Sequence, residues 1–307
     1  MIETSGNLFG RVVTAMVTPF DQNLNLDLPA VERLVNHLIG SGSSAIVVAG
    51  TTGESPTLDD AEKDLLLRAV VKAADKRVKI IMGAGTNDTR KSVAAGQRAE
   101  AAGADALLVV APYYNKPNQE GLKAHFGAIA SASTLPIMVY NIPGRTGINI
   151  NSETVLALAS EFRNIVALKD STGNVEQTQE IAGHADAGFH IYSGDDNLTL
   201  PLLAVGACGV VSVAGHLIGS EIKTMIELFF AGELDRARSL HYKYLPLFRG
   251  LFLAPNPTCV KYALAKMGIC REELRLPLVP LSATQRIVID DLLVGANPKQ
   301  FQVAAGG

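Results

Sequence analysis

Eight short apolar runs recur along the chain, and each is bounded by Gly, Pro, Asn or Asp. Apolar residues follow one another directly in these runs instead of alternating with polar ones. That pattern is typical of strands that are buried on both faces of a sheet. The predicted strands lie at residues 12–17, 45–50, 78–85, 106–111, 136–141, 165–169, 189–194 and 209–214.

Helix-forming segments separate the runs. Residues 28–42 carry apolar side chains at helical spacing, and residues 57–75 open with Thr57, a predicted N-cap, followed by acids in the first turn. Such alternation of strand and helix indicates parallel strands joined by helical crossovers. Eight units in a chain of 307 residues predict an α/β protein, a closed (β/α)8 TIM barrel. An open doubly wound sheet is the alternative, but no run is followed by Gly-x-Gly-x-x-Gly.

The chain continues past the eighth run for longer than one closing helix requires, and its apolar spacing there predicts further helices. We expect a (β/α)8 barrel with the active site over residues 1–230 and a C-terminal helical domain over 231–307. The last ten residues, 298–307, have the composition of a frayed end.

Composition narrows the class of protein. A hydrophobic content of 48% with 19% charged residues describes a chain that buries a large core, and a net charge of −3 gives no reason to expect nucleic acid or a membrane as partner. Cys208, Cys259 and Cys270 are odd in number and widely spaced, which suggests neither disulfides nor a zinc site. The histidines show no metal-ligand spacing. Without a secretory signal or an apolar stretch of about 18 residues, we expect a soluble, cytoplasmic protein.

Reactive side chains gather where the predicted strands end, which is the end of a (β/α)8 barrel that carries the active site. They occur in Gly50-Thr51-Thr52-Gly53-Glu54, in Pro112-Tyr113-Tyr114-Asn115, at Tyr140 and Asn141 with Arg145 soon after, at Lys169, and in Ser193-Gly194-Asp195-Asp196.

Lys169 ends an apolar run and is the central candidate. A lysine at a strand end often only reaches into solvent. A barrel interior, however, disfavours the charged ammonium, and a neutral amine attacks a ketone to form an imine that withdraws electrons from the neighbouring carbon. We therefore expect Lys169 to form a Schiff base.

Three further features suit the same chemistry. The Gly50–Glu54 turn offers amides and hydroxyls to a small carboxylate, although it is also compatible with an ordinary turn. The Tyr140 phenol is placed to relay protons, or else it packs in the core. Arg145 suits a second carboxylate, or else a surface ion pair. Asp195 and Asp196 are interpreted as caps of the helix that follows.

Several segments at these positions resemble the dihydrodipicolinate synthase / N-acetylneuraminate lyase family of Schiff-base aldolases. The resemblance runs from about residue 10 to about residue 290. Its segments are GTTGESPTL at 50–58, PYYNKP at 112–117, YNIPGRTG at 140–147, KDSTGN at 169–174, SGDD at 193–196 and GVVSV at 209–213.

The resemblance implies catalytic roles for four residues. Lys169 matches the lysine that forms the imine with pyruvate, and Tyr140 matches the tyrosine above it. Thr51 matches the threonine that links this tyrosine to a second one. Tyr114 matches that second tyrosine, which enters the site of a neighbouring subunit. The family is implied to be a homotetramer, a dimer of dimers.

The resemblance also implies substrate contacts. Thr52 matches the pocket for the pyruvate carboxylate, while Gly194 and Val211 match positions that line it. Arg145 matches the arginine that receives the carboxylate of L-aspartate-4-semialdehyde. The implied reaction joins these two substrates into 4-hydroxy-tetrahydrodipicolinate, the first committed step of diaminopimelate and lysine biosynthesis, with no metal or organic cofactor.

Two alternatives to this function stay open. One is a pyruvate-dependent retro-aldolase that cleaves a 2-keto-3-deoxy sugar acid or N-acetylneuraminate; such relatives generally lack an arginine at the position of Arg145. The other is an inactive barrel that serves as a scaffold. Regulation also departs from the lysine-inhibited relatives, because Lys63 and Lys91 stand where those carry a histidine and a glutamate, although Asn87 and Tyr113 are retained. Like charges repel, so we expect weak or absent inhibition by lysine.

Overall fold

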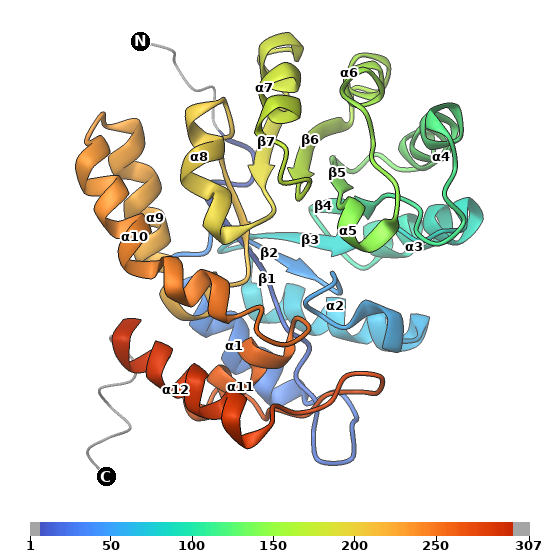
Figure 1. Ribbon diagram of the computed structural model, residues 1–307. Coiled ribbons are helices and arrows are strands. Elements are labelled where there is room, and N and C mark those ends of the chain that lie inside the picture. The colour runs from blue at the N-terminus through green and yellow to red at the C-terminus, as the bar shows by residue number, and fades with distance from the viewer. Residues whose placement is uncertain (1–6, 297–307) are drawn as a thin grey trace.

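The computed structural model describes residues 7–296. Eight parallel strands pair in chain order and the last pairs with the first, so the sheet closes into a barrel (Figure 1). The predicted (β/α)8 fold is therefore confirmed. The strands are β1 (Val12–Ala15), β2 (Ala45–Val48), β3 (Lys79–Gly83), β4 (Ala106–Val110), β5 (Ile137–Asn141), β6 (Ile165–Asp170), β7 (His190–Ser193) and β8 (Gly209–Ser212).

Helices join successive strands and cover the outside of the barrel (Figure 1). Five of these helices, α1, α2, α3, α4 and α7, begin after an Asp or Asn whose side chain accepts a hydrogen bond from a first-turn amide. These residue types are preferred N-caps, so the sequence itself favours a helix start at these positions. The connecting helices are α1 (Leu28–Gly40), η1 (Ser55–Thr57), α2 (Asp60–Ala74), α3 (Thr89–Ala101), α4 (Gln119–Ser131), α5 (Pro143–Thr146), α6 (Ser152–Glu161), α7 (Val175–His184), η2 (Asp196–Leu198) and α8 (Thr199–Ala204).

One predicted helix start was wrong. Thr57 does not cap α2; it ends η1, where its hydroxyl donates to the carbonyl of Glu54. The cap is Asp59, which accepts from the amide of Glu62 while the Glu62 carboxylate accepts from the amide of Asp59. This reciprocal pair satisfies two orphan amides at once, which a single threonine hydroxyl does not.

Alternate strand residues fill the inside of the barrel. Because successive side chains of a strand point to opposite faces, every second residue faces inward. The inward side chains form one apolar cluster that includes Val13, Ala15, Ala45, Val47, Ile81, Ala106, Leu108, Met138, Tyr140, Ala167, Tyr192 and Val211. Lys169 lies two residues after Ala167 on β6 and so shares its inward face.

After β8, α9 (Gly215–Phe230) closes the barrel, and α10 (Leu234–Gly250), α11 (Thr258–Lys266) and α12 (Ala283–Ala296) follow. The helix α10 packs against α9 and α12, and α11 packs against α12 (Figure 1). The predicted C-terminal helices are present; the domain boundary at residue 230 stays a prediction. The segment 298–307, expected to be frayed, lies outside the described residues. Within residues 7–296, no helix has the length and apolar character needed to cross a membrane.

Candidate active site

Lys169 and Tyr140 lie side by side within the mouth of the barrel. The register of β5 and β6 pairs these two residues directly. The Lys169 side chain is buried, with 6% of the residue exposed, and its Nζ lies 4.2 Å from the centroid of the Tyr140 ring. The sequence placed both residues at strand ends, and the closed sheet brings them into contact.

Gly194 provides the space beside Lys169. A Cβ atom at this position would lie 3.1 Å from Cε of Lys169 and 1.9 Å from Oγ of Ser171, so no side chain fits without displacing one of them. The Gly194 amide donates to the carbonyl of Asp170 over 2.7 Å, which holds the glycine against β6. Val211 lies on β8 and is fully buried in the same interior cluster as Tyr140.

Two aspartates follow β7, and their roles differ. Burial raises the pKa of Asp195, and the positive charge of Lys169 opposes that shift. Asp196 accepts hydrogen bonds from the amides of Val213 and Ala214 and from the Ser212 hydroxyl, so its carboxylate fixes the end of β8. Asp195 is the N-cap residue of η2, as interpreted, although its side chain makes no capping hydrogen bond, and Asp196 is the first residue of η2 itself.

The Gly50–Glu54 turn has a strained backbone. Ala49 and Glu54, which bracket it, have φ values of 50° and 54°, in the left-handed region that non-glycine residues rarely adopt. Such residues cluster at functional sites because the surrounding structure must hold them. Among the described residues, no acceptor pairs with the backbone N–H of Thr51 or Thr52. Two adjacent free amides at a strand end suit an anion.

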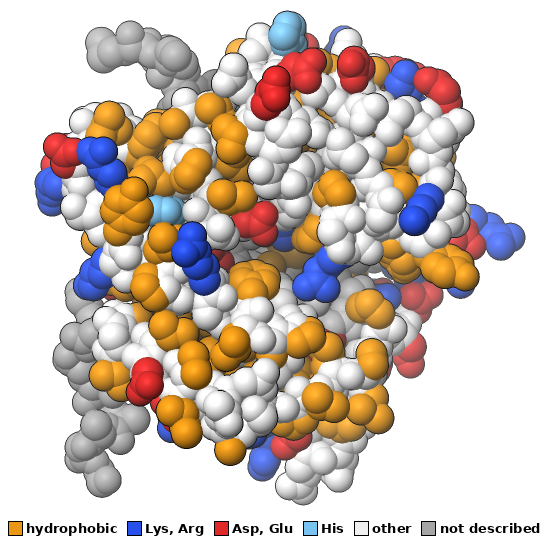
Figure 2. Space-filling view, in the orientation of Figure 1, with side chains coloured by type: hydrophobic (Ala, Val, Ile, Leu, Met, Phe, Trp, Pro, Cys, Tyr) orange, Lys and Arg blue, Asp and Glu red, His pale blue; other side chains and the backbone are white. Residues whose placement is uncertain are grey.

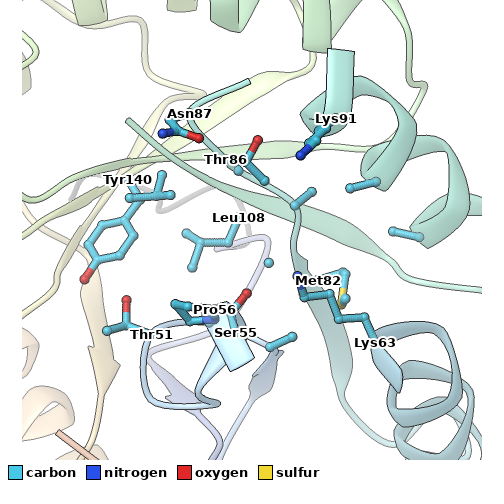
Figure 3. A pocket seen from close by; sticks show the side chains of 18 of the residues that line it. Thr51, Ser55, Pro56, Lys63, Met82, Thr86, Asn87, Lys91, Leu108 and Tyr140 are labelled. Carbon is cyan, nitrogen blue, oxygen red and sulfur yellow. The ribbon is translucent and has the colours of Figure 1, made fainter. Parts of the chain in front are cut away.

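A cavity of about 610 Å³ opens beside this turn. Thr51, Tyr140 and Arg145 line it, together with Lys63 and Lys91 on the far wall (Figure 3). Figure 3 shows the hydroxyls of Thr51 and Tyr140 pointing toward each other. In the space-filling view the molecule is hollowed near the middle of its face, with basic and acidic side chains beside the opening (Figure 2).

Five predicted site residues do not line this cavity: Lys169, Tyr114, Thr52, Gly194 and Val211. Tyr140 joins the two regions, because it lines the cavity and also contacts the Lys169 amine. The site therefore has an inner part around Lys169 and an outer part that leads to Arg145.

Arg145 and Tyr114 are both exposed in the single chain. Arg145 lies on α5, directly after β5, and takes part in no ion pair within residues 7–296. Tyr114 has a φ of 74° and is 89% exposed, so its phenol points away from the barrel that carries it. No three His, Cys, Asp or Glu side chains of the described part are grouped as metal ligands.

Reasoning from strand ends missed two residues that contact the turn. Asn256, in the turn before α11, donates to Thr52, and Lys261, on α11, bonds to Glu54. A signal was present, since Lys261 interrupts the apolar stretch Cys259–Leu264. A lysine inside such a stretch requires a buried partner.

A closed (β/α)8 barrel with a strand-end lysine buried against a tyrosine ring has the architecture of a lysine Schiff-base enzyme. The chain belongs to the dihydrodipicolinate synthetase family, whose model matches residues 8–294. The predicted family resemblance is thus confirmed.

Relatives within this family match nearly the whole chain. The chain is 53% identical over 277 residues to 4-hydroxy-tetrahydrodipicolinate synthase 1 of Halalkalibacterium halodurans, covering 90% of this chain and 94% of that protein. It is 49% identical to 4-hydroxy-tetrahydrodipicolinate synthase of Listeria monocytogenes, covering 94% and 99%. A crystal structure of dihydrodipicolinate synthase from Bacillus anthracis superposes with a TM-score of 0.91 at 50% identity, covering 93% and 98%. That of Cyanidioschyzon merolae, with lysine bound, gives 0.93 at 46%, covering 95% and 99%.

Proposed function

We propose that this chain is a lyase that condenses pyruvate with L-aspartate-4-semialdehyde to give 4-hydroxy-tetrahydrodipicolinate, in diaminopimelate and lysine biosynthesis. The relatives of about 50% identity carry the name of this activity. The observation that carries the mechanism is the buried amine of Lys169, 4.2 Å from the centroid of the Tyr140 ring.

Imine formation starts the reaction. The Lys169 amine attacks the keto carbon of pyruvate, and the carbinolamine loses water to give an iminium ion. Tyr140, whose ring lies against the amine, is the group that passes protons to and from the carbinolamine oxygen. Thr51, whose hydroxyl points toward that of Tyr140, extends this proton path (Figure 3). The iminium then loses a methyl proton and becomes an enamine.

Carbon–carbon bond formation follows. The enamine carbon attacks the aldehyde carbon of aspartate semialdehyde, and the iminium forms again. The amino group of the second substrate then adds to the iminium carbon and displaces the lysine, which closes a six-membered ring and restores the free amine. The lysine itself withdraws the electrons, so the reaction requires no metal or organic cofactor.

The two substrate carboxylates occupy different sides of the site. Thr52 and the unpaired amides of the Gly50–Glu54 turn hold the pyruvate carboxylate, with Gly194 and Val211 lining its pocket. Arg145 takes the carboxylate of aspartate semialdehyde, because it lines the outer cavity and its guanidinium has no competing ion pair among the described residues.

Tyr114 completes the site of a second copy. Its phenol is exposed and does not contribute to the site of its own barrel. A tyrosine held in a strained, left-handed conformation on a surface loop suits insertion into a neighbouring subunit. We infer a homotetramer built as a dimer of dimers. One relative, 39% identical, is described as a monomeric variant, so the oligomeric state needs its own measurement by ultracentrifugation.

The protein is proposed to work in the cytoplasm, with a barrel domain over residues 1–230 and a C-terminal domain over 231–307. Cys208, Cys259 and Cys270 are free thiols, which fits a reducing compartment. Expression with a C-terminal fluorescent tag followed by cell fractionation tests the location.

Borohydride trapping tests the mechanism. Protein incubated with pyruvate and borohydride is expected to gain the mass of one reduced pyruvate on the peptide that carries Lys169. Lys169→Arg is expected to gain none, while Lys223→Arg, an exposed lysine on α9, behaves like the wild type. A folded wild-type protein without this adduct would contradict the proposal.

Acceptor choice tests the substrate. Aspartate semialdehyde is expected to accelerate pyruvate consumption, whereas N-acetylmannosamine is not. The reverse result would favour the retro-aldolase alternative, in which N-acetylneuraminate is cleaved.

A further inference from the structure

The turn before α11, in the C-terminal extension, contacts the Gly50–Glu54 turn through a buried hydrogen bond. The side-chain amide nitrogen of Asn256 donates to Oγ1 of Thr52 over 2.9 Å. Both residues are buried, with 8% and 3% exposed. Because Thr52 accepts this bond, its own hydroxyl proton stays available, and no described residue accepts it.

A buried ion pair also joins the C-terminal extension to this turn, at Lys261, five residues after Asn256. Nζ of Lys261, on α11, lies 2.5 Å from Oε1 of Glu54, and the two side chains are 0% and 1% exposed. The other oxygen of Glu54 accepts from the backbone amide of Arg275 over 3.0 Å. Lys261 also donates to the carbonyl of Glu273 over 2.7 Å. Both carboxylate oxygens of Glu54 thus bond to groups of the C-terminal extension, and the Lys261 amine bonds to the turn and to the extension.

These contacts act on a backbone that needs support. Glu54 has a left-handed φ of 54°, a conformation that costs free energy in a non-glycine residue, so the surrounding structure must hold it. A buried ion pair tolerates little displacement, because each charge has lost its water and depends on its partner. Burial lowers the pKa of Lys261 and the Glu54 carboxylate opposes that shift, so each charge stabilises the other.

We propose that Asn256 and Lys261 are positioning residues, through which the C-terminal extension sets the affinity of the barrel for its keto acid. Neither touches the substrate. Asn256 orients the Thr52 hydroxyl so that it donates to the substrate carboxylate, and Lys261 fixes Glu54 and with it the free amides of Thr51 and Thr52. This inference rests on the proposed function, in which that turn binds the carboxylate of pyruvate.

Asn256→Ala tests the hydrogen bond. The pyruvate concentration that half-saturates borohydride trapping is expected to rise about tenfold or more, the usual effect of weakening a hydrogen bond to a charged group. The KM for aspartate semialdehyde and kcat at saturating pyruvate are expected to stay within about twofold, because Arg145 and Lys169 are unaffected. A purely structural role would instead reduce the active fraction and hence kcat.

A double-mutant cycle identifies the path. If Asn256 acts through Thr52, then Asn256→Ala has no further effect on pyruvate half-saturation once Thr52→Val has removed the hydroxyl. Equal effects of Asn256→Ala in both backgrounds would overturn the proposed path, and so would an unchanged half-saturation in the single variant.

Lys261→Met tests the ion pair, with Lys266→Met as the matched control on the same helix. Lys266 is half exposed, and among the described residues its ion pair is with Asp290 at the surface. Lys261→Met is expected to weaken pyruvate binding at least tenfold, and Lys266→Met to leave it unchanged. Should Lys261→Met fail to fold, as circular dichroism would show, the Asn256 and Thr52 cycle decides the matter. Absence of any adduct in the wild type would reject the proposed function, whereas a normal wild-type adduct with unchanged variants rejects only this inference.

Discussion

Lys169 and Tyr140 are partners in the register of neighbouring strands, and the amine of one lies 4.2 Å from the ring centroid of the other. Both side chains are almost completely buried, with 6% and 5% exposed. Since two adjacent parallel strands fix their separation, the geometry is rigid and does not depend on a loop. That rigidity is what a proton relay beside a covalent lysine requires.

Removal of the Tyr140 phenol should slow the chemistry without preventing pyruvate from binding. Tyr140→Phe is expected to lower kcat by about 10²–10⁴-fold, the usual contribution of a positioned general acid or base. Tyr262→Phe is the control, because within residues 7–296 its hydroxyl bonds to Asp290 on α12 and to no other residue. Steady-state kinetics measure both, and a Tyr140→Phe enzyme of normal kcat would exclude the phenol from the relay.

Gly194 should tolerate no side chain. Gly194→Ala places a Cβ atom 3.1 Å from Cε of Lys169, and we expect the rate of borohydride-trapped adduct formation to fall at least tenfold, since small misplacements of reacting groups have large effects. Gly183→Ala, on α7, meets nothing within 4 Å and is expected to react normally and to be stabilised by about 1 kcal/mol. Equal adduct rates in the two variants would show that Gly194 does not shape the pocket.

The parts of this site that could be predicted are those whose residues are marked by a pattern within a single segment of the sequence. Lys169, Tyr140 and the Gly50–Glu54 turn each follow an apolar run, so the barrel rule alone predicted that they share one rim. The register that sets Lys169 against Tyr140 is a property of the closed sheet and is absent from any single strand. Ala49 and Glu54 gave no signal of their left-handed backbone, because neither is a residue type that favours it.

Long-range contacts were the larger omission. Asn256 lies 204 positions after Thr52 in the chain, and Lys261 lies 207 after Glu54. Both contacts form because the segment that holds Asn256 and Lys261 packs against the Gly50–Glu54 turn, and sequence spacing carries no information on that packing. The alternating pattern thus predicted the fold and the rim, while the contacts that hold the rim in place depend on tertiary packing that no local pattern encodes.

Lysine should inhibit this enzyme weakly or not at all. Lys63 and Lys91 line the outer cavity, and neither forms an ion pair within the described part of the chain, so both present positive charge to a cationic effector. The crystal structure of a relative 46% identical contains bound lysine, so lysine is the effector to test. Initial rates with increasing lysine measure the effect. Strong inhibition at sub-millimolar lysine would show the charge argument to be wrong.

Replacing Lys63 and Lys91 should increase the affinity for lysine, the converse of the weak inhibition expected for the wild type. Lys91→Glu combined with Lys63→His removes both charges that repel an amino group and adds one that attracts it. Lysine is expected to bind this double variant more tightly than the wild type by isothermal titration calorimetry. Lys72→Glu, on α2 but outside the cavity lining, serves as the control for a general change in surface charge.

Stability should fall in mild acid because of His216. This side chain is fully buried; one ring nitrogen accepts from the Val17 amide over 3.1 Å, and the other bonds the carbonyl of Val213 over 2.8 Å. An imidazolium has no acceptor for the Val17 amide, so the fold requires the neutral ring. Burial accordingly lowers the pKa of His216 from 6.5 to about 4.

The sign of the pH dependence follows from that shift. Between pH 6.5 and about 4, His216 is protonated in the unfolded chain but stays neutral in the folded chain. The free energy of unfolding therefore decreases as the pH falls. A difference of this size corresponds to about 3 kcal/mol for one group. Urea titrations at several pH values are expected to give a shallower slope for His216→Gln than for the wild type. His184→Gln, at an exposed site on α7, should keep the wild-type slope, and the same slope in all three proteins would assign the acid sensitivity to other groups.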